Sequence, residues 1–495
     1  MSQRGLKRFG GALFRDDGQD GLLHRAFLRG EGLSADEVRR SPVIGIGTTV
    51  SELNPCNLGL ADLAADVKEG VREAGGLGLE FPTISISEPF SRPTSLFLRN
   101  LMSMDVEEMI GASPIDGVVL LGGCDKTVPA QLMGAISAGK PALVLNAGPR
   151  PVSCFRGNGS FTIDDVWEQC EARRMDELDD EGWAELEGSV NVGVGTCNVM
   201  GTATTMAAIA EVLGFALPGS SLPAAASERR RDLARRTGLE IVGAVGRSSS
   251  PSELVTKSSL ENAFRVVTAV GGSTNAVVHL EAIAGRAGLR IGADGFSAWS
   301  ETTPLLANVR PTGTFLLDDL DEAGGVPAVM SRIRHLVDLD RPTADGRTWR
   351  AVVDERDFPP HPSLATADAP LARRGSLVML RGNLAPDGAV LKVGSSTALV
   401  RRHHARVVVF DGLDDLAARI DDPDLDVDAD TILVLRGMGV QGAPGRIGRC
   451  PTSAVGGPLA YLRTGDEVLI DADEGVIRAL PHRRGTRLES AVAAT

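Results

Sequence analysis

A chain of 495 residues is long enough for two or three domains, and its net charge of −14 argues against nucleic acid or an anionic membrane as the main partner. Hydrophobic residues make up 43% of the chain and glycine contributes 58 residues, which is typical of an α/β protein with many tight strand–helix turns. The sequence contains no run of eighteen apolar residues and no signal-peptide core, so we expect neither a membrane span nor secretion.

The first part of the chain, from about residue 41 to 284, alternates short apolar runs with longer amphipathic stretches. The pattern predicts strands at 43–46, 118–121 and 142–145, and helices at 60–74 and 275–284. This alternation favours a parallel sheet covered by helices.

The segment Leu120-Leu-Gly-Gly-Cys-Asp-Lys-Thr-Val-Pro129 places a thiol, a carboxylate and an amine on one glycine-flanked turn. Cys124, Asp125 and Lys126 should lie at the carboxyl end of a strand, where open α/β sheets bind ligands. A soft ligand beside a hard one indicates two kinds of metal close together. A buried cysteine beside a solvated Asp–Lys pair explains the same residue types equally well.

Two further polar residues follow from this pattern. Glu88 comes just after the apolar run 81–86, so we expect it too at a strand end. His279 lies four residues after Asn275, on the same helix face, and we expect a core histidine with its hydrogen bonds satisfied.

The last part of the chain reads as a separate β-rich unit. Residues 354–372 are rich in proline and indicate a linker or exposed loop. Strands are expected at 377–380, 406–410, 432–435 and 467–470, and Pro386-Asp-Gly388 has the composition of a turn. We therefore predict an α/β fold with an N-terminal parallel-sheet domain, 1–355, and a smaller β-rich domain, 373–495.

Several segments in a fixed order resemble the dihydroxy-acid dehydratase and phosphogluconate dehydratase family. Besides the Cys124-Asp-Lys126 motif, they are Asn54-Pro-Cys-Asn57, Glu80-Phe-Pro-Thr-Ile-Ser85, Gly195-Thr-Cys-Asn-Val-Met-Gly-Thr-Ala203, Gly271-Gly-Ser-Thr-Asn275 and Gly382-Asn-Leu-Ala-Pro-Asp-Gly388. The stretch Ser87-Glu-Pro-Phe-Ser-Arg-Pro-Thr94 is most similar to the sugar-acid (aldonate) dehydratase branch.

The resemblance implies an iron–sulfur cluster, [2Fe–2S] or [4Fe–4S], held by Cys56, Cys124 and Cys197. Their wide spacing alone is a poor indicator of a cluster, and the remaining cysteines, Cys154, Cys170 and Cys450, are interpreted as structural. No two cysteines form a C-x-x-C pair, and free thiols suit a reducing cytoplasm.

The resemblance also implies a Mg²⁺ site built from Glu88, Asp125 and Lys126. A protonated lysine cannot bind a cation, so Lys126 would serve as a carbamate formed with CO₂. The alternative is that Lys126 is a cationic anchor for substrate. The implied reaction is dehydration of a 2,3-dihydroxy acid to a 2-keto acid. The implied assembly is a homodimer or tetramer, with pairing to a paralogue as a further option.

The chain departs from the family near its C-terminus. No Asp or Glu occurs between Asp430 and Asp466, so the acidic residue that completes the family's metal site has no local replacement. Val455 is followed directly by Gly456, and the block that carries the serine base in the family is missing at this junction. No base is assigned; Ser453, Cys450 and a residue of a partner subunit are the candidates, although Thr452 and Ser453 also fit ordinary turn chemistry.

Two functions of different classes follow. One is an active, divergent dehydratase whose base lies elsewhere, since a general base typically contributes only ~10²–10⁴-fold. The other is a non-catalytic homologue that acts as a structural or regulatory partner. The retained thiolates and carboxylates favour the lyase.

Overall fold

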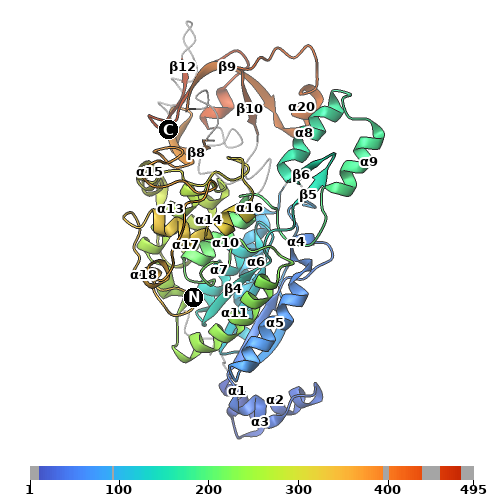
Figure 1. The fold of residues 1–495 in the computed structure, drawn as a ribbon, viewed down its shortest axis with the longest axis vertical. Helices are drawn as coiled ribbons and strands as arrows, with labels where there is room; N and C mark the ends of the chain where they lie inside the picture. The colour runs from blue at the N-terminus through green and yellow to red at the C-terminus, as the bar shows by residue number, and fades with distance from the viewer. Residues whose placement is uncertain (1–10, 92–93, 394–400, 438–456, 481–495) are drawn as a thin grey trace.

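The computed structural model describes residues 11–91, 94–393, 401–437 and 457–480. A small helical lobe lies at one end of the molecule, a helix-covered parallel sheet forms the middle, and a second sheet lies at the other end (Figure 1). The lobe consists of α1 (Ala12–Arg15), α2 (Gln19–Gly30) and α3 (Ala35–Arg40).

The parallel sheet has four strands in the order β2-β1-β3-β4. They are β1 (Val43–Thr48), β2 (Leu77–Pro82), β3 (Gly117–Gly122) and β4 (Ala142–Asn146). Alternate residues enter two different cores. Ile44 and Val119 pack toward α5 (Leu60–Glu73) and α11 (Glu228–Gly246), whereas Val43 and Val118 pack toward α6 (Arg99–Ala112) and α7 (Thr127–Ala138). The predicted strands and their parallel pairing are confirmed, because a sheet covered on both faces requires such apolar runs.

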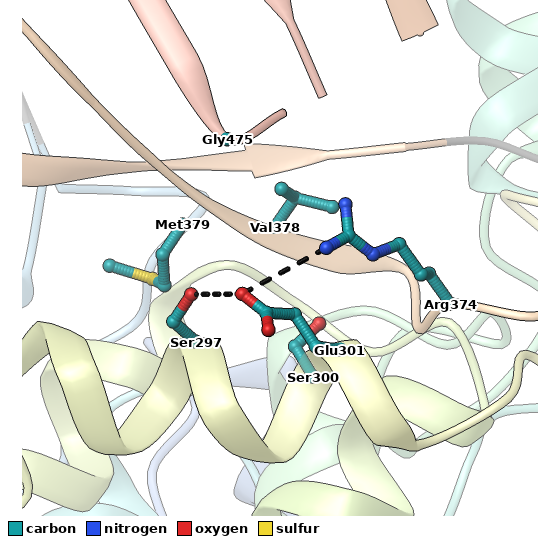
Figure 2. A pocket seen from close by; sticks show the side chains of 7 residues that line it. All are labelled: Ser297, Ser300, Glu301, Arg374, Val378, Met379 and Gly475. Carbon is teal, nitrogen blue, oxygen red and sulfur yellow. Dashed lines mark hydrogen bonds and ion pairs between the residues drawn. The ribbon is translucent and has the colours of Figure 1, made fainter. Parts of the chain in front are cut away.

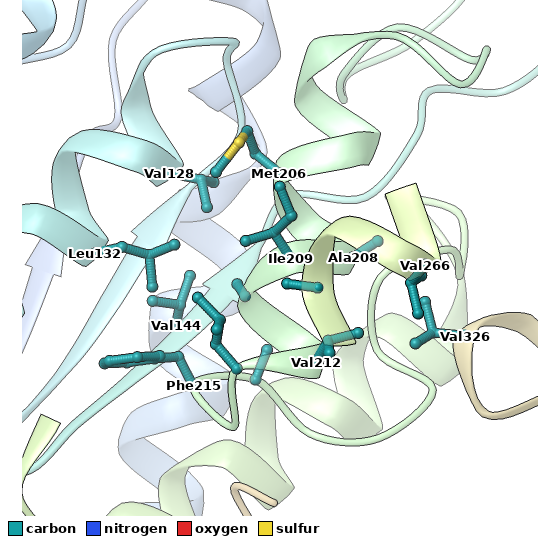
Figure 3. Close-up of a cluster of buried hydrophobic side chains, with 14 of the residues drawn as sticks. Val128, Leu132, Val144, Met206, Ala208, Ile209, Val212, Phe215, Val266 and Val326 are labelled. Atoms are coloured by element: carbon teal, nitrogen blue, oxygen red, sulfur yellow. The ribbon is translucent and has the colours of Figure 1, made fainter. Parts of the chain in front are cut away.

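The larger core surrounds α10 (Thr202–Val212), in which every residue is buried. Figure 3 shows Met206, Ile209 and Val212 of this helix between Val144 of β4 and Val266 of α13 (Lys257–Ala269). A helix that is buried on every face lies in the middle of a large core. The start of α10 is therefore fixed against the sheet edge where the predicted site residues lie.

The other helices build the outer layers and the connections. They are α12 (Pro251–Leu254), α14 (Asn275–Arg286), α15 (Gly292–Thr302), α16 (Leu317–Glu322), α17 (Gly325–Arg332) and α18 (Trp349–Asp354). An excursion between β4 and α10 consists of the hairpin β5 (Ser153–Phe155) and β6 (Asn158–Phe161), followed by α8 (Ile163–Arg174) and α9 (Asp180–Ser189).

The second sheet is mixed, with six strands in the order β10-β9-β11-β12-β7-β8. They are β7 (Leu377–Gly382), β8 (Ala385–Lys392), β9 (Arg402–Asp411), β10 (Ile432–Arg436), β11 (Glu467–Asp471) and β12 (Val476–Leu480), with α20 (Gly412–Arg419) and η3 (Pro458–Tyr461) alongside. The predicted β-rich C-terminal part is confirmed.

Two local expectations were wrong. Pro386-Asp-Gly388 lies inside β8, because a register shift opposite Leu380 and Gly382 accommodates this stretch in the ladder with β7. The 354–372 segment is not an exposed linker throughout, since Leu364 is buried and pairs with Ala307.

None of the helices in the described ranges is long and apolar enough to span a membrane.

Candidate functional site

The three predicted cluster cysteines meet at the carboxyl edge of the parallel sheet. Cys56 lies on α4 (Pro55–Leu58), which follows β1, and Cys124 follows β3 directly. Cys197 lies on the loop before α10. This loop pairs with the chain after β4, where the Arg150 amide donates to Thr196 O at 2.9 Å. Three segments that are distant in sequence thus converge at the edge where α/β sheets bind ligands.

Cys124 is the centre of this group of thiols. Its Sγ is in hydrogen-bond contact with the Cys56 thiol and accepts from the Glu88 amide at 3.4 Å, while its own amide donates to Asn57 Oδ1 at 3.0 Å. The hydrogen bond from the Cys56 thiol, and after it those from the Glu88 and Asp125 amides, lower the pKa of Cys124 despite its burial. The contact with Cys124, together with burial, raises the pKa of Cys56, so Cys124 is the first of the pair to ionise.

Cys197 belongs to the same electrostatic environment. Burial raises its pKa to about 11, and the charges of Asp125 and Cys124 act in the same direction. Arg150 opposes them. A bound cation would reverse this effect, because metal coordination favours the thiolate form.

The predicted metal ligands form a second group beside the thiols. Lys126 Nζ donates to Glu88 Oε2 at 3.1 Å and to Asp125 Oδ2 at 3.4 Å. The lysine is only 2% exposed, whereas the two carboxylates remain partly open to solvent. An amine in this position is buried between two acids at the start of α7.

Glu88 is fixed by the segment that follows it. Thr94 Oγ1 donates to Glu88 Oε1 at 3.0 Å, the Ser95 amide donates to Oε2 at 3.1 Å, and the Ser95 hydroxyl donates to the same oxygen. Burial would raise the pKa of Glu88, but the Ser95 hydrogen bonds and the Lys126 charge outweigh it and lower this pKa. Glu88 is therefore held as a carboxylate.

Asp125 has a different environment. Burial raises its pKa, and the Lys126 charge and a hydrogen bond from Thr202 only partly offset this effect. Thr202 begins α10, so the buried central helix orients this acid.

The expected strand-end position of Glu88 was wrong. The strand β2 ends at Pro82, and Glu88 lies six residues later in an irregular segment. The ladder with β1 stops there because the Ile84 amide donates to Asp105 Oδ2 of α6, at 2.8 Å, instead of to β1. The loop still brings Glu88 to Lys126.

Two groups near the site were not identified as functional from the sequence. Thr202, within the quoted Gly195–Ala203 segment, contacts Asp125, and Ser95 immediately follows the quoted Ser87–Thr94 segment. Their position in or beside the quoted family segments was the only sequence feature that could have marked them as part of the site. Ser453 and Cys450, the candidate bases, lie outside the described residues.

His279 is buried, as expected, but only half of its ring is satisfied. Its Nδ1 is 2.9 Å from Arg99 Nη1, and its Nε2 has no hydrogen-bond partner in the part of the chain that the structure describes.

In the described part of the chain, no three side chains of His, Cys, Asp and Glu surround a single metal position. A small pocket lies elsewhere, between α15 and β7, where Ser297, Glu301 and Arg374 face one another (Figure 2). It contains none of the predicted site residues, so the thiol and carboxylate groups remain the candidate site.

Comparison with known proteins identifies the family. Residues 41–352 match the model for the N-terminal part of dihydroxy-acid/6-phosphogluconate dehydratases, and residues 363–449 match the C-terminal one. The chain is 39% identical to L-arabinonate dehydratase of Rhizobium leguminosarum bv. trifolii, over 92% of this chain and 85% of that protein. It is 38% identical to 6-deoxy-6-sulfo-D-gluconate dehydratase of Pseudomonas putida, over 94% and 87%. Dihydroxy-acid dehydratase of Pyrobaculum aerophilum shares 33%, over 93% and 89%. The chain therefore belongs to the dihydroxy-acid/6-phosphogluconate dehydratase family of hydro-lyases.

Proposed function

We propose that this protein removes water from a sugar acid, or a related 2,3-dihydroxy carboxylic acid, and yields a 2-keto acid. The observation that carries the proposal is the buried Lys126 between Glu88 and Asp125, next to three converging thiols. A sugar acid is the preferred substrate class because the two sugar-acid dehydratases above share more identity with this chain than the dihydroxy-acid dehydratase does.

The donor set fits the two inorganic groups that the family resemblance implies. Cys56, Cys124 and Cys197 would hold an iron–sulfur cluster, whose iron atoms each take their own thiolates, so the thiols need not surround one ion. Glu88, Asp125 and a carbamylated Lys126 would hold Mg²⁺ through oxygen. When bound, the two groups supply positive charge for a leaving hydroxyl and a developing enolate.

Buried polar atoms at the edge of the site support this fit. Among the described residues, Asn54 Oδ1, Ser87 Oγ and Asn198 Oδ1 have no hydrogen-bond partner, although each side chain is at most 4% exposed. Each lies within two residues of a proposed ligand. Buried polar groups are normally paired, so their clustering here indicates that the site is completed by further groups.

The protein's own residues hold the acid groups in place for the reaction. Ser95 and Thr94 fix Glu88, and Thr202 fixes Asp125. The proton on C2 leaves to a base, the C3–oxygen bond breaks, and the resulting enol tautomerises to the keto acid with net loss of water. The base itself is not assigned: Ser453, Cys450 and a residue of a partner subunit are the candidates from the sequence.

The alternative is a non-catalytic partner protein. It is favoured by the missing base-bearing block between Val455 and Gly456, together with the absence of any acidic residue between Asp430 and Asp466, where the family carries a further acidic ligand.

Anaerobic purification followed by iron, sulfide and magnesium quantitation tests both readings. In the same preparation, 2-keto acid formation is assayed on a panel of aldonic acids and branched 2,3-dihydroxy acids. We expect both metals and turnover of an aldonic acid, and no turnover by Lys126→Arg. A preparation with neither metals nor turnover contradicts the proposal and favours the partner protein.

A further inference from the structure

A buried Arg–His pair lies near enough to the proposed metal site for the charge of Lys126 to act on its histidine, His279. Arg99 begins α6 and His279 lies on α14, and the two side chains meet in the interior with exposed fractions of 7% and 0%. Arg99 Nη1 lies 2.9 Å from His279 Nδ1. Neither residue takes part in the proposed reaction.

The contact fixes the tautomer of His279. A guanidinium can only donate hydrogen bonds, so Nδ1 must accept and the ring proton must lie on Nε2. Burial, with the nearby charges of Arg99 and Lys126, lowers the pKa of His279, which keeps the ring neutral. The Nε2–H group is then a buried donor without a partner among the described residues.

Both residues connect to the residues that hold the proposed ligands. His279 follows Asn275 by one helical turn, and Asn275 Nδ2 donates at 2.9 Å to Thr202, which bonds to Asp125. Arg99 follows Ser95, which holds Glu88, by one turn. The helices α6 and α14 both pack against α7, and Lys126 immediately precedes that helix.

The charge of Arg99 is not balanced by an acid. No carboxylate lies within ion-pair distance of it among the described residues, and burial lowers its pKa to about 10. Removing one partner from a buried charge pair is strongly destabilising, so an unpaired buried guanidinium calls for negative charge nearby. With a protonated Lys126, Glu88 and Asp125 already have a cation between them. A carbamate on Lys126 would replace that cation with an anion.

We propose that Arg99 and His279 are positioning residues for a carbamate on Lys126: Arg99 fixes the His279 tautomer, and His279 Nε2–H donates to the carbamate. The inference rests on the proposed function, because it takes Lys126 as an oxygen ligand. The neutral Lys126 amine attacks the carbon of CO₂, a nitrogen–carbon bond forms, one carbon–oxygen π bond breaks onto oxygen, and nitrogen releases a proton to solvent. The pair stabilises the product of this addition.

The test is ¹³C NMR of the purified protein after incubation with Mg²⁺ and limiting ¹³C-bicarbonate, which reports the carbamate carbon without any turnover. Wild-type protein should give a carbamate signal that Lys126→Arg abolishes. His279→Leu and Arg99→Met should each need about tenfold more bicarbonate for the same signal, since the partners that orient a metal ligand typically contribute that much to its site. His279→Gln, which retains a terminal N–H donor, should recover part of the loss.

Asn262→Ala is the matched control, because it removes a buried side chain of α13 that exchanges hydrogen bonds with the backbone of Asp338 and has none with a proposed ligand among the described residues. It should leave the carbamate signal at the wild-type level, and unfolding midpoints identify any variant that fails to fold. The inference is overturned if folded His279→Leu needs no more bicarbonate than the wild type for the same carbamate signal. It is also overturned if the wild-type protein gives no carbamate signal. A normal carbamate signal with no turnover of any acid instead overturns the proposed substrate while the positioning role stands.

Discussion

At the scale of single residues, Cys124 lies between the three cysteines of the site and the set formed by Glu88, Asp125 and Lys126. Its sulfur contacts Cys56 and accepts from the amide of Glu88, and its neighbour Asp125 contacts Lys126. A substitution here should therefore affect both proposed inorganic sites, whereas a cysteine outside the site should affect neither.

Replacing Cys124 with serine should abolish the visible absorbance of the cluster, because a neutral hydroxyl is a poor substitute for the thiolate that iron–sulfur clusters require. The measurement is the absorption spectrum of anaerobically purified protein with its iron and sulfide content. Cys154→Ser is the control, since Cys154 is an exposed free cysteine on β5. An unchanged spectrum in Cys124→Ser would refute the three-thiolate assignment.

A second residue-scale prediction concerns Glu211, which is fully buried near the end of α10. Its carboxyl group accepts from the Gly219 amide at 2.6 Å and from the Ser221 amide at 3.0 Å, yet burial raises its pKa to about 7. The unfolded chain ionises near the ordinary value of 4.5. Between these values the unfolded state has released its proton and the folded state has not, so stability falls as pH rises.

The expected loss from this one group approaches about 3 kcal/mol between pH 4.5 and pH 7 and then levels off. Glu211→Gln cannot ionise, so the stability difference between wild type and variant should shift in favour of the variant as pH rises from 5 to 8. Urea unfolding at a series of pH values measures this difference. A difference that is constant with pH would show that Glu211 is ionised in the folded protein throughout.

At the scale of elements, α5 and α11 cross at glycine. A Cβ atom on Gly70 would overlap the carbonyl oxygen of Arg235, and one on Gly238 would overlap that of Val67. The two backbones approach closely only because both residues lack a side chain. This contact fixes the helix layer that covers one face of the parallel sheet.

Gly70→Ala should lower the free energy of unfolding by about 1–3 kcal/mol, because the methyl group forces the helices apart. Gly111→Ala is the control: it lies in α6 and meets no atom within 4 Å, so it should be neutral or slightly stabilising through helix propensity. Thermal unfolding followed by circular dichroism compares the two variants. Equal midpoints would mean that the crossing can open without cost.

The same elements show how far the sequence predicts this structure. The strands β1, β3 and β4 were predictable because parallel strands covered on both faces must be continuously apolar, and the Cys124 turn follows from β3. The end of β2 was not predictable, since it depends on the Asp105 side chain from a helix more than twenty residues away. Strand β8 was missed because its Pro-Asp-Gly composition is that of a turn, and only pairing with β7 keeps it extended.

The site was predictable only in part for a similar reason. Motifs point to the proposed ligands Cys56, Glu88 and Lys126, because the chemistry demands particular residue types. They do not identify Arg99 and His279, whose meeting depends on how α6 and α14 pack together. The contact that selects the tautomer of His279 joins two segments 180 residues apart, so neither segment alone predicts it.

At the scale of the whole molecule, the candidate site brings together chain segments that are distant in sequence and are otherwise linked only by the packing of helices and strands. The proposed ligands follow β1, β2 and β3 or precede α10, so a bound cluster and Mg²⁺ would link four separate stretches of chain. The boundaries 1–355 and 373–495, and assembly into a homodimer or tetramer, remain our proposals for the larger organisation.

Removal of iron and magnesium should therefore destabilise the folded protein, because a group that binds only the native state contributes about 3–4 kcal/mol when present at 100 to 1,000 times its dissociation constant. Chelation should lower the unfolding midpoint, and hydrogen exchange should increase first at 49–57, 84–91, 94–95, 122–127 and 195–201, while the central helix α10 stays protected. In Cys124→Ser, which already lacks the cluster, iron chelation should cause little further change. A uniform increase in exchange across the whole chain, equal in both proteins, would indicate that the fold loosens independently of these segments and would contradict their role as the ligand-bearing stretches.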